Sequence, residues 1–182
     1  FEIPEFTPKH LHEKKEEDEG PRKTVVYPLI PRKPAKGEQV LALAKIYWDG
    51  KLGRYIYQVE EPQLSPNITE LMKKVKEFLE DRLDIDFSKL RLTEARDFLN
   101  KQVDEILRYY KVILSPDELK ALQYFIERDF IGLGKIEPLM RDEQIEDISC
   151  DGIGIPIFIF HRNQDIGSVS TNISFESAEE LD

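Results

Sequence analysis

Soft metal ligands and disulfide-forming residues are scarce in this 182-residue chain, which holds one cysteine, Cys150, and three histidines. A single cysteine excludes an intramolecular disulfide framework and fits a reducing compartment. So few thiol and imidazole groups also argue against a structural zinc site. His10 and His12 stand close together in a polar segment, where solvated side chains are a simpler interpretation than metal ligands. We therefore expect no metal site.

Long apolar runs are also absent. No stretch approaches the roughly 18 to 20 apolar residues that a membrane-spanning helix needs. The start, "FEIPEFTPKH", lacks the basic and apolar regions of a signal peptide. We expect a cytoplasmic protein. Because the first residue is Phe1 rather than a methionine, we also expect the chain to be a piece of a longer polypeptide.

Basic residues are nearly missing from the C-terminal segment. Residues 142–182 contain one base, Arg162, against ten acids, so this segment carries −9 of the formal net charge of −10. An acidic surface repels a phosphate backbone, which argues against a nucleic-acid partner. Two interpretations remain for the acidic residues: a solubilising face, or a docking face for a basic partner.

Catalytic motifs are missing too. Gly132-Leu133-Gly134-Lys135 resembles a phosphate-binding loop, but G-x-x-x-x-G-K-[ST] requires Gly at position 129 and Ser or Thr at position 136. The chain has Asp129 and Ile136 there. The run "DEQIEDISCDG" lacks the register of a calcium loop, and no serine-protease triad or HExxH motif occurs. We predict no catalytic residue and no cofactor-binding loop in this chain.

The N-terminal residues 1–37 form an extended arm rich in proline and charge. They hold six of the eleven prolines and the run "EKKEEDEG". Such a segment is ordered only where it packs on something else, and it could serve as a binding arm. Within it, "TVVYPLIP" is apolar enough for an edge strand that stops at a proline.

A β-hairpin is predicted next. Apolar and aromatic runs at 39–48 and 54–60 flank a turn that contains Asp49-Gly50 and Gly53. The aromatic residues of the two runs favour packing across the strands, while a ligand platform is the alternative. They are Tyr47, Trp48, Tyr55 and Tyr57.

Three amphipathic helices follow the hairpin. Ser65-Pro66 opens the first, and the second spans about 92–112, with apolar residues recurring at helical spacing in both. Ser115, Pro116 and Glu118 form a capping box that begins the third. Mutual burial of the three apolar faces predicts a helical bundle.

After Gly134 the apolar residues change to the period of strands. Short strands are predicted at 145–150, 155–161 and 167–173, with a tight turn at Asp151-Gly152. Ser177 and Glu180 have capping-box spacing and predict the start of a helix. The fold class is thus α+β: a hairpin and a three-helix bundle, then the start of an α/β unit.

The run "GLGKIEPLMRDEQIEDISCDGIGIPIFIFHR" resembles the N-terminal region of the type II/type IV secretion ATPase superfamily, and most of all its archaeal branch of GspE-like ATPases and archaellum motor ATPases. The family pattern "GLG.IEPL..D..IEDI..DG", with a following aromatic-His-Arg, is matched by Gly132, Gly134, Ile136, Glu137, Pro138, Leu139, Asp142, Ile145, Glu146, Asp147, Ile148, Asp151, Gly152, Phe160, His161 and Arg162. The resemblance covers about residues 38–182 and is sharply diagnostic over 132–182.

We expect three parts. The first is the arm (1–37), which the resemblance does not cover. The resemblance implies a hairpin and three-helix domain (38–131) and the first part of a PAS-like α/β domain (132–182). In the family this region sits on a RecA-like ATPase core, which binds ATP and Mg²⁺. Subunits form hexameric rings and work with a membrane platform protein at the inner face of the cell membrane. The phosphate loop and the other core motifs have no counterpart in this sequence.

We therefore expect a non-catalytic, mechanical role in pilus, archaellum or pseudopilus assembly, which is a form of protein secretion. The alternative is a stand-alone adaptor whose PAS-like part binds a small ligand or a partner. Arg162 is a candidate for a nucleotide-facing or subunit contact, with a surface arginine that pairs with a neighbouring acid as the simpler interpretation.

Overall fold

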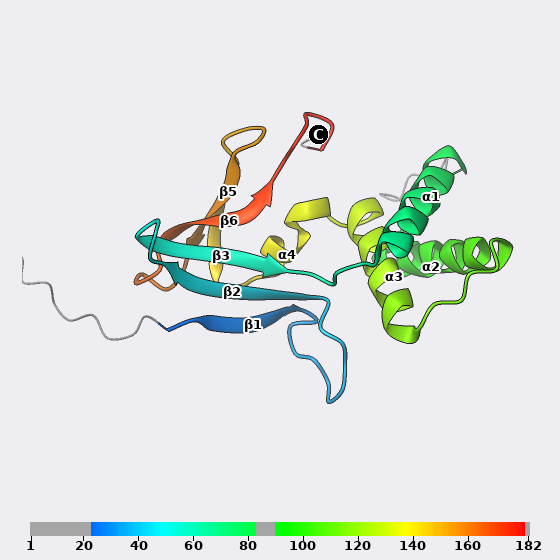
Figure 1. Ribbon diagram of the computed structural model, residues 1–182, viewed down its shortest axis with the longest axis horizontal. Coiled ribbons are helices and arrows are strands. Elements are labelled where there is room, and N and C mark those ends of the chain that lie inside the picture. The colour runs from blue at the N-terminus through cyan, green and yellow to red at the C-terminus, as the bar shows by residue number, and fades with distance from the viewer. Residues whose placement is uncertain (1–22, 83–89, 181–182) are drawn as a thin grey trace, which may run out of the picture.

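The computed structural model describes residues 23–82 and 90–180, which form a mixed α+β fold (Figure 1). A bundle of three long helices lies at one end of the long axis and a curled sheet at the other, with a short helical segment between them. The helices are α1 (Pro66–Arg82), α2 (Leu92–Tyr109), α3 (Pro116–Phe130), the 3-10 turn η2 (Gly134–Ile136) and α4 (Glu137–Met140).

Six strands form one sheet within the described part of the chain, in the order β1-β2-β3-β6-β5-β4. Neighbouring strands are antiparallel except β3 and β6, which are parallel. The predicted edge strand is confirmed as β1, and β4 forms the other edge. The strand bounds are β1 (Val25–Ile30), β2 (Ala42–Asp49), β3 (Arg54–Glu60), β4 (Ile145–Ser149), β5 (Pro156–His161) and β6 (Ser168–Ser174).

The predicted hairpin is confirmed as β2 and β3. Its turn is closed by Asp49, whose Oδ1 accepts the backbone N–H groups of Lys51 and Leu52 at 2.8 and 3.0 Å. Gly53 has φ +62°, a value that glycine adopts without strain. Trp48 and Tyr55 face each other in register, with their ring centroids 5.3 Å apart. Trp48 and Tyr55 therefore pack across the strands, as predicted.

The hairpin shares its sheet with the C-terminal strands. The sequence predicts that the hairpin forms a unit with the three helices. In the structure β3 instead pairs with β6, through Ile56 with Ser170 and Tyr57 with Thr171. The side chain of Asn172 reinforces this pairing, because its amide bonds both the N–H and the C=O of Val59, at 2.8 and 2.9 Å. The sequence does not predict this pairing, because strands so far apart in the chain produce no local pattern that identifies them as partners.

The three long helices pack against one another through the apolar faces that the sequence predicts. Its core combines Leu71, Val75, Leu79, Leu99, Val103, Ile106, Leu107, Leu122 and Ile126 from the three long helices. The capping box of α3 is confirmed: Glu118 N–H donates to Ser115 Oγ, and Ser115 N–H donates to Glu118 Oε2 at 2.9 Å. Helix α2 ends at Tyr109, earlier than predicted, because Lys111 takes φ +54° and turns the chain.

The predicted helix start near Ser177 is wrong, because residues 175–180 are not helical. Glu180 N–H does reach Ser177 Oγ at 3.4 Å. However, the Glu180 carboxylate accepts the Glu176 N–H and pairs with Lys135 at 2.7 Å. These bonds hold the segment against the turn that follows α3. Residues 181 and 182 lie outside the described part of the chain.

The sheet has a core of its own, and α4 contributes to it. Leu139 is almost fully buried with Ala44, Ile46, Ile157 and Ile159 of the sheet. The short segment between the two units is therefore anchored to the strands by an apolar contact. None of the helices in the described residues is long and apolar enough to cross a membrane.

Candidate functional site

The Gly-Leu-Gly-Lys turn leads from α3 into η2 and α4. Its Leu133 N–H donates to Glu137 Oε2 at 3.0 Å, so an internal carboxylate occupies the turn. A Cβ atom at Gly132 would lie 2.7 Å from the carbonyl oxygen of Arg128 and 3.2 Å from Glu137 Oε2. The first glycine is thus required for close approach of the turn to α3 and to Glu137, a steric role that needs no ligand.

Glu137, the first acid of the run from Gly132 to Gly152, is largely buried, with 8% of its surface exposed. Its second oxygen, Oε1, accepts a hydrogen bond from Arg141 Nε at 2.7 Å. A buried carboxylate is costly unless its lone pairs are used, and both oxygens are used here. Glu137 therefore fixes the turn at one end of α4 and the guanidinium of Arg141 at the other.

Asp142, in the same run, connects the segment after α4 to the sheet. Its Oδ2 accepts the hydroxyl groups of Tyr27 in β1 and Tyr57 in β3, at 2.6 and 2.7 Å. Its Oδ1 accepts the N–H of Gln144 at 2.8 Å. Burial, reinforced by the hydrogen bonds to Asp142, raises the pKa of both tyrosines well above the usual value. Both therefore stay protonated and donate at neutral pH.

His161 completes this buried cluster. Its Nε2 lies 3.5 Å from the Tyr27 hydroxyl, and its Nδ1 accepts the N–H of Asn163 at 3.0 Å. Burial lowers the pKa of His161, and the charge of Asp142 opposes that shift. A neutral ring that accepts at Nδ1 carries its proton on Nε2. The cluster of Tyr27, Tyr57, Asp142 and His161 is thus a satisfied polar joint.

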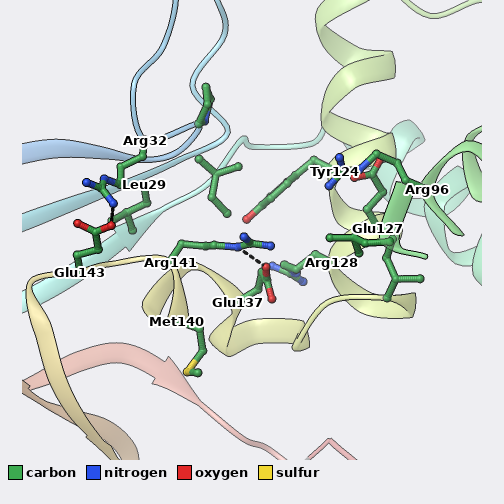
Figure 2. A pocket seen from close by; sticks show the side chains of 14 residues that line it. Leu29, Arg32, Arg96, Tyr124, Glu127, Arg128, Glu137, Met140, Arg141 and Glu143 are labelled. Carbon is green, nitrogen blue, oxygen red and sulfur yellow. Dashed lines mark hydrogen bonds and ion pairs between the residues drawn. The ribbon is translucent and has the colours of Figure 1, made fainter. Parts of the chain in front are cut away.

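A cavity of about 490 Å³ opens between the bundle, β1 and α4 (Figure 2). Four arginines line it, each from a different segment, and three glutamates stand among them. Figure 2 shows Arg32 with Glu143 on one side, Arg96 with Glu127 on the other, and Arg141 with Glu137 between. The lining consists of Leu29, Ile30, Pro31, Arg32, Leu92, Arg96, Tyr124, Glu127, Arg128, Ile131, Glu137, Met140, Arg141 and Glu143.

Arg128 is the most buried of the four lining arginines, with its side chain 11% exposed. Its Nη1 bonds both oxygens of Glu61 at 2.8 Å, and its Nε bonds Asp129 at 2.8 Å. Tyr124 donates to the same Glu61 at 2.5 Å. Glu61 follows β3, whereas Arg128 and Tyr124 belong to α3. This polar group therefore joins α3 of the bundle to the residue that directly follows β3.

Arg162 lies on the surface and does not line the cavity. Its Nε donates to the carbonyl oxygen of Glu143 at 2.6 Å, and its Nη1 lies 3.4 Å from Glu146 Oε1. The side chain is 55% exposed. It therefore pairs with a neighbouring acid, while a nucleotide or subunit contact stays a prediction. Across residues 23–82 and 90–180, no three His, Cys, Asp or Glu side chains are grouped so that they could hold a metal ion.

The sequence pattern marks the turn, Glu137 and Asp142, because they stand together in one run from Gly132 to Gly152. It does not mark their partners, since Tyr27 and Tyr57 lie far from Asp142 in the sequence. No local pattern joins the four cavity arginines either, because they come from four different segments.

Comparison with known proteins gives two relatives, both from Methanocaldococcus jannaschii, while no family model matches the chain. The uncharacterized protein MJ1288 is 37% identical over 126 residues, which cover 69% of this chain and 49% of the relative. The uncharacterized protein MJ0900 is 37% identical over 71 residues, which cover 39% of this chain and 12% of the relative. The chain thus spans about half the length of the first and a small part of the second.

Proposed function

We propose that this chain is the non-catalytic N-terminal region of a hexameric archaeal secretion ATPase. Its parent protein would power the assembly of a pilus, an archaellum or a pseudopilus and the associated protein secretion. The observation that carries the proposal is the run from Gly132 to Gly152, which has the family's pattern and lies where the helical bundle meets the sheet. The archaeal source of both relatives agrees with it.

The proposed role is mechanical. Leu139 and Asp142 fasten the segment that follows α3 to the sheet, through apolar packing and two tyrosine hydrogen bonds. Glu137 fills the turn that connects this segment to the bundle. A joint of this kind transmits force between two packed units instead of absorbing it in a loop. In the parent protein such a region would position neighbouring subunits and dock to the membrane platform protein.

ATP and Mg²⁺ are assigned to the RecA-like core of the parent protein. The turn at 132–135 does not fit a nucleotide phosphate, because Glu137 already accepts the Leu133 N–H. Lys135 is likewise paired with Glu180, at 2.7 Å. We therefore assign no step of ATP hydrolysis to the described residues.

Two experiments test the proposal. Purified chain should hydrolyse ATP in the presence of Mg²⁺ no faster than the buffer alone, and robust turnover would refute a non-catalytic role. The gene should also encode G-x-x-x-x-G-K-[ST] downstream of residue 182, in the same frame. A stop codon directly after residue 182 would contradict the motor assignment.

The second candidate is a stand-alone adaptor, and the arginine-lined cavity is the observation that favours it. A cavity of about 490 Å³ is in the range that small ligands occupy. The downstream gene sequence distinguishes the two candidates, since an adaptor requires no phosphate loop.

A further inference from the structure

The cavity wall contains guanidinium groups that are only partly used. Within the described segments, Arg141 bonds Glu137 through Nε, and Arg96 bonds Glu127 through Nε at 2.8 Å. The terminal Nη groups of these two arginines have no protein partner there. Their side chains are 53% and 45% exposed, so the unused donors are accessible. An arginine held by its Nε keeps a planar pair of N–H donors for an incoming oxyanion.

The charge of the cavity wall favours a ligand with one negative group over a polyanion. The positive charge of Arg128 is neutralised by its ion pairs with Glu61 and Asp129. The remaining three arginines of the lining stand against three glutamates. Balanced charge offers no net attraction to a polyanion such as a triphosphate, whereas directional bonds from a fixed guanidinium still favour one carboxylate.

Apolar side chains also line the cavity. Leu92 and Met140 are half-exposed, Ile131 is half-buried and Leu29 is buried. A ligand that removes these side chains from water gains about 25 cal/mol per Å² of apolar area. The same ligand therefore needs an apolar body next to its charged head.

We propose that this cavity binds one carboxylate carried on an apolar body. The carboxylate is bound by the terminal N–H groups of Arg141, with Arg96 as the second donor, and the apolar body lies against Leu92 and Met140. Two sources share this chemistry: a free apolar carboxylic acid, and a glutamate flanked by apolar residues in a polypeptide. The inference concerns the cavity alone and holds whether or not the chain belongs to a secretion motor.

The test is an NMR titration of the ¹⁵N-labelled 182-residue chain with 4-methylpentanoate and with the capped peptide acetyl-Leu-Glu-Leu-amide. The expected result is a saturable shift of signals at Arg96, Arg141 and Leu92, with Kd on the order of 1 mM for the better probe. The tighter of the two probes identifies the source of the ligand. The uncharged controls are 4-methylpentanamide and acetyl-Leu-Gln-Leu-amide, which we expect to bind at least about fivefold more weakly.

Arg96→Gln and Arg141→Gln should each weaken binding at least about fivefold, whereas Arg162→Gln, outside the cavity, should not change it. If Arg141→Gln fails to fold, Arg141→Lys replaces it. This variant keeps the positive charge beside Glu137 but lacks the planar guanidinium group, so it should also weaken binding. The proposal is overturned if the neutral controls bind as well as the acids. It is equally overturned if inorganic phosphate binds more tightly, if the arginine variants bind like the wild type, or if nothing shifts up to about 20 mM probe.

Discussion

The hydroxyl of Tyr57 donates to Oδ2 of Asp142 at 2.7 Å, across 85 positions of sequence. The same oxygen accepts Tyr27, so one carboxylate joins two strands to the segment that follows α4. Asp142 is 7% exposed and Tyr57 is fully buried. This buried bond lies within the run from Gly132 to Gly152 and holds that run to the sheet.

Removing this carboxylate should destabilise the fold. We expect Asp142→Asn to lower the free energy of unfolding by about 2 kcal/mol, because two charge-assisted bonds are lost. Tyr57→Phe should cost less, about 1 kcal/mol, since Tyr27 and Gln144 still serve the carboxylate. Urea unfolding followed by circular dichroism measures both. Asp147→Asn, at the exposed edge strand β4, is the matched control, with an expected change within about 0.5 kcal/mol. Equal effects of the two aspartate variants would contradict the assignment.

His161 should make stability depend on pH in the mildly acidic range. Burial lowers its pKa in the folded state, so the unfolded chain binds the proton more readily. The free energy of unfolding therefore falls as the pH drops below about 6.5, the ordinary histidine value, towards the lowered folded-state pKa. Urea unfolding between pH 7.5 and 5.5 should show this slope in the wild type and a shallower slope in His161→Gln. Parallel slopes in the two proteins would exclude His161 as the cause.

Position 132 requires glycine because a larger side chain would not fit there, and not because of the backbone φ angle. A methyl group there would meet the Arg128 carbonyl oxygen at 2.7 Å and Glu137 Oε2 at 3.2 Å. We expect Gly132→Ala to destabilise the chain by about 1–3 kcal/mol, as overpacking of a tight contact does. At Gly50, in the hairpin turn, an added Cβ has no neighbour within 4 Å. Gly50→Ala should therefore leave the melting temperature nearly unchanged, and a comparable loss in both variants would count against the steric explanation.

Much of the fold follows from local sequence. The hairpin, the three long helices and the capping box at Ser115 depend on neighbouring residues, and all are present. The parallel pairing of β3 and β6 is reinforced by Asn172, which bonds Val59, and no period or turn signal contains this relation between distant segments. Residues 175–180 do not form the helix expected near Ser177, and Glu180 instead pairs with the distant Lys135.

Less of the candidate site than of the fold could be predicted from the sequence. The glycine turn could be separated from a phosphate loop by its wrong flanking residues, Asp129 and Ile136. What fills the turn could not be inferred, because a glutamate three residues after a glycine is compatible with many arrangements. The four cavity arginines come from β1, α2, α3 and α4 or the residues directly after these elements, so only tertiary structure brings them together.

We expect residues 132–142 to act as an internal joint and not as a nucleotide cradle, and the amide signal of Leu133 distinguishes the two. In ¹⁵N-labelled chain, Mg²⁺-ATP should leave the signals of residues 132–135 in place, while Glu137→Gln should shift the Leu133 amide, because its carboxylate acceptor is lost. A saturable response of these amides to ATP, together with a Leu133 signal unaffected by Glu137→Gln, would show instead that the turn binds nucleotide.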